Sequence, residues 1–545
     1  MFELKTLVIG FDGGTWTVLD HLIAKGRMPT LKKIKEKGAW GILKSTIPPV
    51  TCPAWPSMST GKNAAKHGVL NFEMFQFPNY TFRIATSNDF KVKTHYEILD
   101  DHELRSILIN LPGLYPAKKI SGIIITDILT QNEAKMVYPQ EIREKYKEAF
   151  DGDAGKNEKP YTIFYSPDPL LSTLQNIQNI RQIMQARMRV TKELFQKETW
   201  DHFFVVFEEI DSLQHIGYTY SVEGAKGPEA QAMADLFEEL DGYLAWFMEH
   251  QSADTVLLIA SDHGFTKVKG LFYVNVWLEK LGLLKTRFTS AKKSEVQYEQ
   301  IKETTQLVGN EQVSKLAQWF FSKRFFRPLI RRAYPLVKKI IQKDIRPAYA
   351  TGIDFEQSLA FCKDHNTHGV YLNDARFSHG KQENRTLASR IKEELLKVIG
   401  PNGEKIVEQA WLREEVYTGP HIEGLPDVVF ELMEGFVPLV DLDAPMVESI
   451  NRETGDHHRN GILALWGAGI KPNPNRDIFD KAPRVFSIFD VAPTLLHLHG
   501  IGPDADSDGR ILGELFEFVP EKRKGPTEET RIKHRLEHLK KIGKI

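Results

Sequence analysis

Cysteine is scarce in this sequence, with only Cys52 and Cys362 among 545 residues. Two cysteines cannot form the disulfide scaffold of a small secreted protein, and their scarcity suits a reducing compartment. No run of about 20 apolar residues is long enough to span a bilayer. The N-terminal stretch MFELKTLVIGFDGG is too short in its apolar part, and too interrupted by charge, for a signal peptide. We therefore expect a cytoplasmic protein with no transmembrane segment.

An excess of charge of either sign is also missing. The chain has 71 Lys and Arg against 72 Asp and Glu, which gives a net charge of −1. No global field favours a nucleic-acid polymer or a membrane surface, so we expect a small-molecule ligand. The composition, 41% hydrophobic and 26% charged, is that of a globular protein. The length allows two to four domains or one large α/β domain with insertions, and the oligomeric state cannot be inferred.

Five compact apolar runs predict buried β-strands. The first ends in Asp-Gly-Gly, and the others have the same form: TLVIGFDGG (6–14), SILINLP (106–112), HFFVVFEEID (202–211), TVLLIASDHG (255–264) and GILALWGAGI (461–470). Helical patterns, such as residues 180–198, separate them. Strands alternating with helices predict an α/β fold whose mostly parallel sheet is covered on both faces.

Residues 285–350 differ from the rest of the chain because they are basic and aromatic and carry no strand signal. We interpret them as a helical insertion, or lid, on a discontinuous catalytic core formed by residues 1–284 and 351–515. Residues 516–545 are charged and are predicted to be a C-terminal tail.

Three carboxylates fall at the ends of predicted strands, namely Asp12, Asp211 and Asp262. In a parallel sheet the carboxyl ends of the strands share one edge, where ligands bind. We therefore expect these three side chains to converge.

Histidines accompany two of these carboxylates. If a helix begins at Asp211, His215 lies on the same face and the pair can share a metal ion. His263 directly follows Asp262 in a turn, so both can reach one ion. The alternative is structural: an acidic residue that stabilises a helix start, a surface histidine, and a simple Asp-His-Gly turn.

A third histidine cluster, His457 and His458, precedes the last predicted strand. One of the two is a candidate distant ligand, although a solvated loop would explain both. Together, the carboxylates and imidazoles are enough ligands for two ions, with Zn²⁺ favoured and Mn²⁺ as the alternative. Two ions about 4 Å apart can clamp the attacking and leaving oxygens of phosphoryl transfer.

Thr51 is the candidate nucleophile. It lies in the proline-rich stretch PPVTCPAWPSMSTGKNAAKHG (48–68), where prolines fix the backbone around it. A hydroxyl becomes a strong nucleophile when a metal ion binds it. The structural alternative makes Thr51 the N-cap of the following helix. Both readings can hold, because a helix N-terminus also favours phosphate.

The sequence resembles the alkaline phosphatase superfamily, and within it the type I phosphodiesterase/nucleotide pyrophosphatase family. The resemblance spans residues 6 to 515 and rests on nine segments in order: VIGFDGG, TCPAWPSMSTGKNAAKHG, DSLQHIG, SDHGF, VNVWLEKLGLL, HGVYLN, LPDVV, GDHHRNGILALWGAGI and SIFDVAPTLLHLHGI. It implies a three-layer sandwich of the alkaline phosphatase type.

The resemblance also implies two metal sites. Asp12, Thr51, Asp262 and His263 would form one, and the other would comprise Asp211, His215 and His457. His457 is chosen over His458 because the family's ligand stands four residues before the glycine, here Gly461. Thr51 would attack phosphorus and form a covalent phospho-threonine intermediate. Lys62, or the backbone N–H of Cys52, is a candidate donor to the phosphoryl oxygens.

The function expected from this resemblance is hydrolysis of a phosphodiester or nucleotide pyrophosphate. A phosphomonoesterase or a phosphoglycerate-mutase-like phosphotransferase on the same scaffold is an alternative, and a catalytically silent protein that binds phosphate or membranes is another. A sulfatase is disfavoured, because Thr51 occupies the place of that branch's cysteine and Trp55 the place of its arginine.

Overall fold

The computed structural model describes residues 4–76, 81–156, 158–162, 167–168, 171–222, 224–287, 352–373, 381–473, 477–480, 482–523 and 525. The predicted helical insertion at 285–350 therefore lies almost wholly outside the described residues. Most of the predicted tail at 516–545 lies outside them as well.

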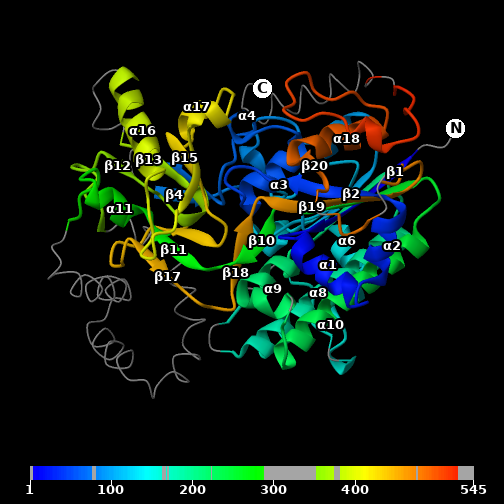
Figure 1. Cartoon of the computed structure of the whole chain (residues 1–545). Coiled ribbons are helices and arrows are strands. Elements are labelled where there is room, and N and C mark those ends of the chain that lie inside the picture. Colours follow the sequence, from blue (N-terminus) through cyan, green and yellow to red (C-terminus); the bar gives the residue numbers. More distant parts are fainter. Residues whose placement is uncertain are drawn as a thin grey trace, which may run out of the picture.

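A nine-stranded sheet forms the centre of the molecule (Figure 1). Its strands lie in the order β20-β2-β19-β9-β1-β8-β5-β6-β7. In that order their bounds are Arg484–Ser487, Ala39–Lys44, Asn460–Gly467, Thr255–Ala260, Lys5–Phe11, His202–Phe207, Ser106–Ile109, Gly122–Ile125 and Val137–Tyr138. All five predicted strands are present, and they are consecutive in the middle of the sheet as β19-β9-β1-β8-β5.

The register of the central strands brings their carboxyl ends to one rim. β1 pairs in parallel with both β8 and β9, so that Gly10 lies opposite Val206 on one side and Ala260 on the other. β19 differs from the other predicted strands because it is antiparallel to β9. Its first residues, rather than its last, therefore lie at this rim.

Helices cover both faces of the sheet, as predicted for an α/β three-layer fold. Alternate residues of β1 face opposite sides, with Leu7 and Ile9 in one hydrophobic cluster and Val8 in another. The first cluster packs against α1 (Trp16–Ala24), α2 (Pro29–Lys37), α8 (Thr173–Lys197), α9 (Glu209–Gly217) and α10 (Pro228–His250). The second packs against α3 (Thr51–Thr60), α5 (His95–Asp101) and α18 (Val491–Leu498).

A second structural part lies beside the sheet, on the left of Figure 1, and has its own hydrophobic cluster. Its four-stranded antiparallel sheet has the order β12-β13-β15-β14, with bounds Ala360–Phe361, Gly369–Leu372, Val428–Leu432 and Val407–Leu412. A three-stranded sheet has the order β16-β11-β17, with bounds Phe436–Leu439, Gly270–Tyr273 and Val447–Ser449. α11 (Val274–Lys280) and α16 (Lys381–Leu395) contribute to the same cluster. The proposed division into core, insertion and tail stays a prediction.

A two-stranded ribbon connects the two parts at the rim. β10 (Gly264–Lys267) follows Asp262 and His263 directly, and it pairs with β18 (Gly455–His458), which leads into β19. In this pairing Phe265 lies opposite His457. The ribbon therefore brings His457 back to the carboxyl end of β9.

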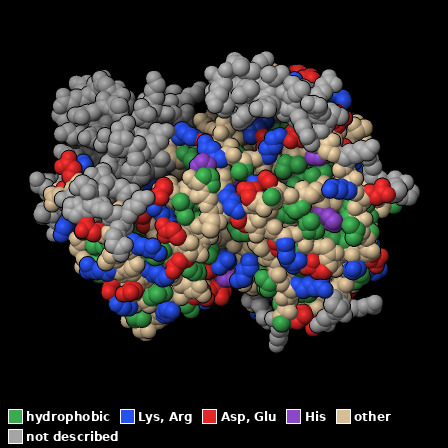
Figure 2. Space-filling model, turned by 90° about the horizontal axis from the view of Figure 1, so that it is seen from above, with side chains coloured by type: hydrophobic (Ala, Val, Ile, Leu, Met, Phe, Trp, Pro, Cys, Tyr) green, Lys and Arg blue, Asp and Glu red, His purple; other side chains and the backbone are tan. Residues whose placement is uncertain are grey.

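The surface carries acidic and basic side chains interspersed over the described residues on the face that Figure 2 shows. This mixing agrees with the balanced charge of the chain. Among the described helices, none combines the length and the apolar character needed to cross a membrane.

Candidate metal centre

Segments that are far apart in the sequence meet at the carboxyl rim of the sheet. Asp12 follows β1, Asp262 follows β9, and Asp211 lies in the first turn of α9, just beyond β8. His457 arrives from β18. The three carboxylates that the strand pattern placed at one edge do converge, since Asp12 and Asp211 share a group of ligand atoms with His263, and Oδ2 of Asp262 lies 3.2 Å from Nε2 of the same histidine.

The first group surrounds His263, which is completely buried. Its Nε2 lies 3.2 Å from Oδ2 of Asp262 and 3.5 Å from Oδ1 of Asp12. Ligand atoms of Asp12, Asp211 and His263 all lie within 4.8 Å of one another, which is close enough to share one metal ion.

The second group comprises Asp211, His215 and His457, whose ligand atoms also lie within 4.8 Å of one another. Oδ1 of Asp211 is 3.5 Å from Nε2 of His215 and 3.4 Å from Nε2 of His457. The two imidazole Nε2 atoms are 3.0 Å apart. The helical spacing predicted for Asp211 and His215 is therefore present, and Asp211 belongs to both groups.

Thr51 lies beside the first group. Its Oγ1 is 3.2 Å from Nε2 of His263. The reading of Thr51 as a helix N-cap is wrong, because α3 begins at Thr51 itself and Val50 is the N-cap, with no side-chain capping bond. The helix starts earlier than expected because Pro53 needs no N–H partner in the first turn. The hydroxyl is thus left facing the cluster.

Two of the histidines have a defined tautomer. Nδ1 of His263 lies 3.1 Å from the carbonyl oxygen of Gly264, and Nδ1 of His215 lies 3.3 Å from that of Gly455. A carbonyl oxygen can only accept, so each Nδ1 carries the hydrogen and each Nε2 presents its lone pair to the cluster. This is the arrangement that a metal-ligating histidine requires.

Five buried carboxylate oxygens have no hydrogen-bond partner among the described residues. Two of them, Oε2 of Glu209 and Oδ1 of Asp254, lie outside the cluster, and three lie in it: Oδ1 of Asp12, Oδ1 of Asp211 and Oδ2 of Asp262. Buried polar atoms are normally hydrogen-bonded, and buried charges are normally paired or metal-bound. All three oxygens belong to the predicted ligands. The donor set and its unsatisfied oxygens therefore fit divalent cations.

The crowding of charge alters the acidities of this cluster. Burial and the neighbouring carboxylates raise the pKa of Asp262 to about 7 and raise the pKa of Asp12 well above its usual value. Burial opposes ionisation of Asp211 too, but His215 and His457 outweigh it and lower the pKa of Asp211. Burial alone would lower the pKa of His457, yet its contact with Asp211 raises it to about 9. Bound cations would relieve the repulsion between the carboxylates.

Further side chains hold the ligands in place, and the sequence arguments did not find them. The Trp55 indole N–H donates to Oδ2 of Asp12 over 3.0 Å. Gln214 of α9 donates to the carbonyl oxygen of Gly13 over 2.8 Å, and the N–H of Gly13 donates to Oδ1 of Asp262 over 3.2 Å. One signal in the sequence could have indicated Gln214, because it is a polar residue on an otherwise apolar face of its helix.

Two other candidates lie apart from the cluster. The Lys62 ammonium is 2.7 Å from Oδ2 of Asp504 and also contacts Asp506, and its side chain is 4% exposed. Among the described residues, none of its ion-pair partners is a carboxylate of the cluster. Its role as a donor to the phosphoryl oxygens stays a prediction. Nδ1 of His458 lies 3.2 Å from the N–H of Asn460. Of the two adjacent histidines, His457 is the one beside Asp211, with its Nε2 3.4 Å from Oδ1 of that carboxylate.

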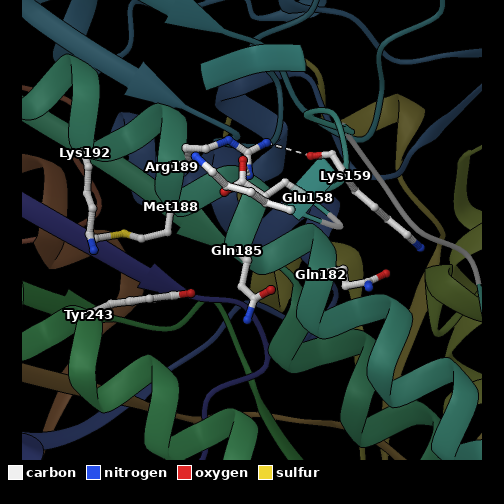
Figure 3. Close-up of a pocket in the computed structure, with 9 residues that line it drawn as sticks. Glu158, Lys159, Gln182, Gln185, Met188, Arg189, Lys192 and Tyr243 are labelled. Carbon is white, nitrogen blue, oxygen red and sulfur yellow. Dashed lines mark hydrogen bonds and ion pairs between the residues drawn. The ribbon is translucent and has the colours of Figure 1, made fainter. Parts of the chain in front are cut away.

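A separate pocket opens on the outer face of α8 (Figure 3). It has a volume of about 350 Å³, and four cationic side chains and one carboxylate line it, together with Tyr243 of α10. None of the eight predicted site residues, which are the seven metal-site residues and Lys62, lines this pocket. The chemistry predicted from the sequence therefore resides at the sheet rim and not in this pocket.

A family model described as type I phosphodiesterase / nucleotide pyrophosphatase matches residues 6–322. The chain belongs to this family. The matched segment includes Asp12, Thr51, Asp211, His215, Asp262 and His263. The family is one of phosphoric ester hydrolases, so the chain is assigned to that enzyme class. A comparison with curated proteins finds no match to the sequence.

Solved structures of similar fold cover most of the chain. Phosphonoacetate hydrolase from Sinorhizobium meliloti 1021, in complex with phosphonoacetate, is 15% identical with a TM-score of 0.52, and the match covers 90% of this chain and 94% of that one. Human ectonucleotide pyrophosphatase / phosphodiesterase 5 is 13% identical with a TM-score of 0.50, covering 94% and 100%. At these identities the likeness shows the fold alone.

Proposed function

We propose that this member of the family is a two-metal phosphohydrolase that cleaves a phosphodiester or a nucleotide pyrophosphate through a phospho-threonine intermediate. The observation that carries the proposal is the set of three unsatisfied carboxylate oxygens beside three imidazole nitrogens and one threonine hydroxyl. A silent binding protein would have no need to bury repelling carboxylates around a hydroxyl.

The ligand sets are those that the resemblance implies, and Asp211, which belongs to both groups at the rim, is assigned to the second. Asp12, Asp262, His263 and Thr51 would hold one ion, and Asp211, His215 and His457 the other. Two divalent cations, for which we expect Zn²⁺ first and Mn²⁺ second, would neutralise charge on the phosphoryl oxygens and lower the pKa of the attacking hydroxyl and water.

Thr51 supplies the nucleophile. It is the first residue of α3, so the substrate's phosphoryl group would also lie at the positive end of a ten-residue helix. In the first displacement a bond forms between Oγ1 and phosphorus, the bond to the leaving oxygen breaks, and that oxygen takes up the proton. In the second, a water oxygen replaces Oγ1 and the threonine hydroxyl is restored.

The nearest alternatives are distinguished by substrate. Murine ectonucleotide pyrophosphatase / phosphodiesterase 5, 14% identical, has been solved as an inactive threonine-to-alanine variant in complex with AMP. The phosphonoacetate hydrolase has been solved with phosphonoacetate. Nucleotide diesters, pyrophosphates, phosphomonoesters and phosphonates therefore belong in one assay panel. The proposed location, the cytoplasm, rests on the sequence argument only.

The test compares the wild-type protein with Thr51→Ala and Thr51→Ser, each stripped by a chelator and then given Zn²⁺ or Mn²⁺. We expect metal-dependent turnover of bis(p-nitrophenyl) phosphate or of a nucleotide pyrophosphate, with about two ions bound per chain. Thr51→Ala should lose at least about 1,000-fold in kcat with metal content largely retained, because loss of a nucleophile commonly costs more than this. Thr51→Ser keeps a hydroxyl and should retain part of the rate.

Three other results would contradict the proposal. Turnover of p-nitrophenyl phosphate alone would indicate the phosphomonoesterase alternative. A protein that binds neither ion and turns over no substrate would be the silent binder. Wild-type turnover by Thr51→Ala would remove the threonine intermediate from the mechanism.

A further inference from the structure

Arg187 is a fully buried charge in the middle of α8. Its Nε donates to Oε1 of Glu209 over 2.8 Å, and its Nη2 donates to Oε1 of Glu208 over 2.9 Å. Its Nη1 donates to the hydroxyl of Tyr161 over 3.2 Å. The planar guanidinium therefore holds two consecutive carboxylates at once, which only arginine has the geometry to do.

The two glutamates form the junction that leads into the metal centre. Glu208 directly follows β8, which ends at Phe207, and Glu209 is the first residue of α9. Asp211 and His215 lie further along the same short helix. Because Arg187 is hydrogen-bonded to both junction residues, it fixes the position at which α9 begins and the rotation of the helix about its own axis. That rotation determines where Asp211 and His215 point.

The contacts of α9 divide between its two ends. Beyond the junction, Gln214 ties the helix to the carbonyl oxygen of Gly13. Arg187 supplies the corresponding tie at the amino end, from the helix that packs on the outside of α9. Loss of the guanidinium would leave the amino end, which carries Asp211, without its charged anchor.

Charge gives a second reason for an arginine at this position. Glu208 and Glu209 are both buried at the junction that leads into the cluster. Without Arg187, two buried carboxylates would be uncompensated beside a cluster that already holds three. The positive charge of Arg187 thus balances the two junction glutamates, so that they do not add to the negative charge of the metal centre.

We propose that Arg187 is a positioning residue for the second metal group, acting through Glu208 and Glu209 on Asp211 and His215. This inference rests on the proposed two-metal function. The competing explanation is that the buried ion pairs serve folding alone, which would leave the affinity for ions unchanged once the variant is folded.

The main test variant is Arg187→Lys, which keeps the charge and removes the fork that reaches both glutamates. Its matched control is Arg181→Lys on the same helix. Arg181 pairs with Glu239 of α10 over 2.6 Å and does not touch the junction. Glu209→Ala is a milder second variant. It removes one of the two ion pairs of Arg187 and leaves the charge of the guanidinium balanced by Glu208.

The readout is Zn²⁺ binding to the chelator-stripped full chain, measured by calorimetric titration, with circular dichroism to confirm the fold. We expect Arg187→Lys and Glu209→Ala to weaken one of the two binding events by about 10–100-fold, as the loss of residues behind metal ligands commonly does. Arg181→Lys should bind both ions like the wild-type protein. In turnover assays kcat should fall while KM changes little.

Wild-type affinity for both ions in folded Arg187→Lys would overturn the inference and leave the two-metal function standing. If Arg187→Lys fails to fold, wild-type affinity in Glu209→Ala would overturn it equally. A wild-type protein that binds no ion would instead overturn the proposed function, and this inference with it.

Discussion

The indole N–H of Trp55 donates a hydrogen bond to Oδ2 of Asp12 over 3.0 Å, and both side chains are buried. The bond satisfies one oxygen of Asp12, whereas Oδ1 has no hydrogen-bond partner among the described residues and lies in the cluster. The helix that begins with Thr51 and the strand that ends before Asp12 are thereby joined. Trp55 fixes which oxygen of Asp12 faces the candidate ions.

Trp55→Phe should weaken metal binding as well as stability. Phenylalanine keeps a buried ring but leaves Oδ2 of Asp12 without its donor, which costs about 1–3 kcal/mol of unfolding free energy. We expect the affinity for Zn²⁺ to fall in the same variant, because Asp12 loses its fixed orientation. Urea unfolding and metal titration measure the two effects.

Trp16 provides the control for this substitution. Its indole N–H donates to the carbonyl oxygen of Gly41 over 2.8 Å, and it lies in α1, outside the cluster. Trp16→Phe should lower stability by a similar amount and leave metal affinity unchanged. Equal metal affinities in the two variants would show that the Trp55 bond serves packing only.

Gly10→Ala should disturb the same tryptophan by overpacking. A Cβ at Gly10 would lie 2.6 Å from Cη2 of Trp55 and 2.9 Å from Cγ2 of Val206. Such overpacking typically costs about 1–3 kcal/mol, and we expect Trp55 to move away from Asp12. Gly242→Ala, in α10 with open space around the new methyl group, should instead stabilise the protein by about 0.5–1 kcal/mol. Thermal unfolding of the two variants gives the comparison.

Much of the candidate site could be predicted from strand ends alone. Asp12, Asp211 and Asp262 follow apolar runs, and parallel strands bring their carboxyl ends together. His457 required the resemblance, because the residues alone did not choose between it and His458. Its place at the rim depends on β19 being antiparallel, and an apolar run carries no sign of its direction.

Other parts of the site could not be read from the chain. Lys62 looked like a free cation near the nucleophile, but its partners, Asp504 and Asp506, come from more than 400 positions away in the sequence. Trp55 gave no sign that its N–H would meet a carboxylate, since a tryptophan in an apolar motif reads as core. Arg187 lies on the buried face of an amphipathic helix, where only the fold brings Glu208 and Glu209 to it.

Stability should fall in acid because of a buried histidine network beneath the opposite end of the sheet. Nε2 of His95 lies 3.1 Å from Nε2 of His202, and Oγ1 of Thr6 bridges His202 and His499 at 2.8 and 2.9 Å. Burial lowers the pKa of His95 to about 4 and that of His499 to about 3. Burial also lowers the pKa of His202.

The sign of the effect follows from proton counts. Between about pH 6.5 and pH 4 the unfolded histidines bind protons that the folded ones exclude, so the free energy of unfolding rises with pH in this window. Each histidine contributes up to about 1.4 kcal/mol per pH unit. Urea unfolding at several pH values should therefore show a shallower slope for His499→Gln. His250→Gln, at an exposed position, should keep the wild-type slope, and a wild-type slope in both variants would contradict the prediction.

Asp262→Asn should separate metal binding from folding. Asp262 is completely buried; its Oδ1 accepts the N–H of Gly13, and its unpartnered Oδ2 lies 3.2 Å from Nε2 of His263. Asparagine keeps the acceptor, removes a charge that repels Asp12, and brings an N–H that can donate to the imidazole lone pair. We expect the metal-free variant to gain on the order of 1–3 kcal/mol of unfolding free energy while binding fewer ions per chain.

Asp241→Asn is the matched control, because both oxygens of this buried carboxylate already accept N–H groups, from Thr30 over 2.9 Å and from Leu31 over 2.8 Å. In Asp241→Asn, the side-chain N–H group would face the backbone N–H of either Thr30 or Leu31, and two donors repel each other. The metal-free stability should therefore fall, and the metal content should stay the same. Urea unfolding after chelation, with metal analysis before it, tests both variants. If Asp262→Asn is destabilised as Asp241→Asn is, the rim carboxylates serve the fold, and their unsatisfied oxygens do not indicate bound cations.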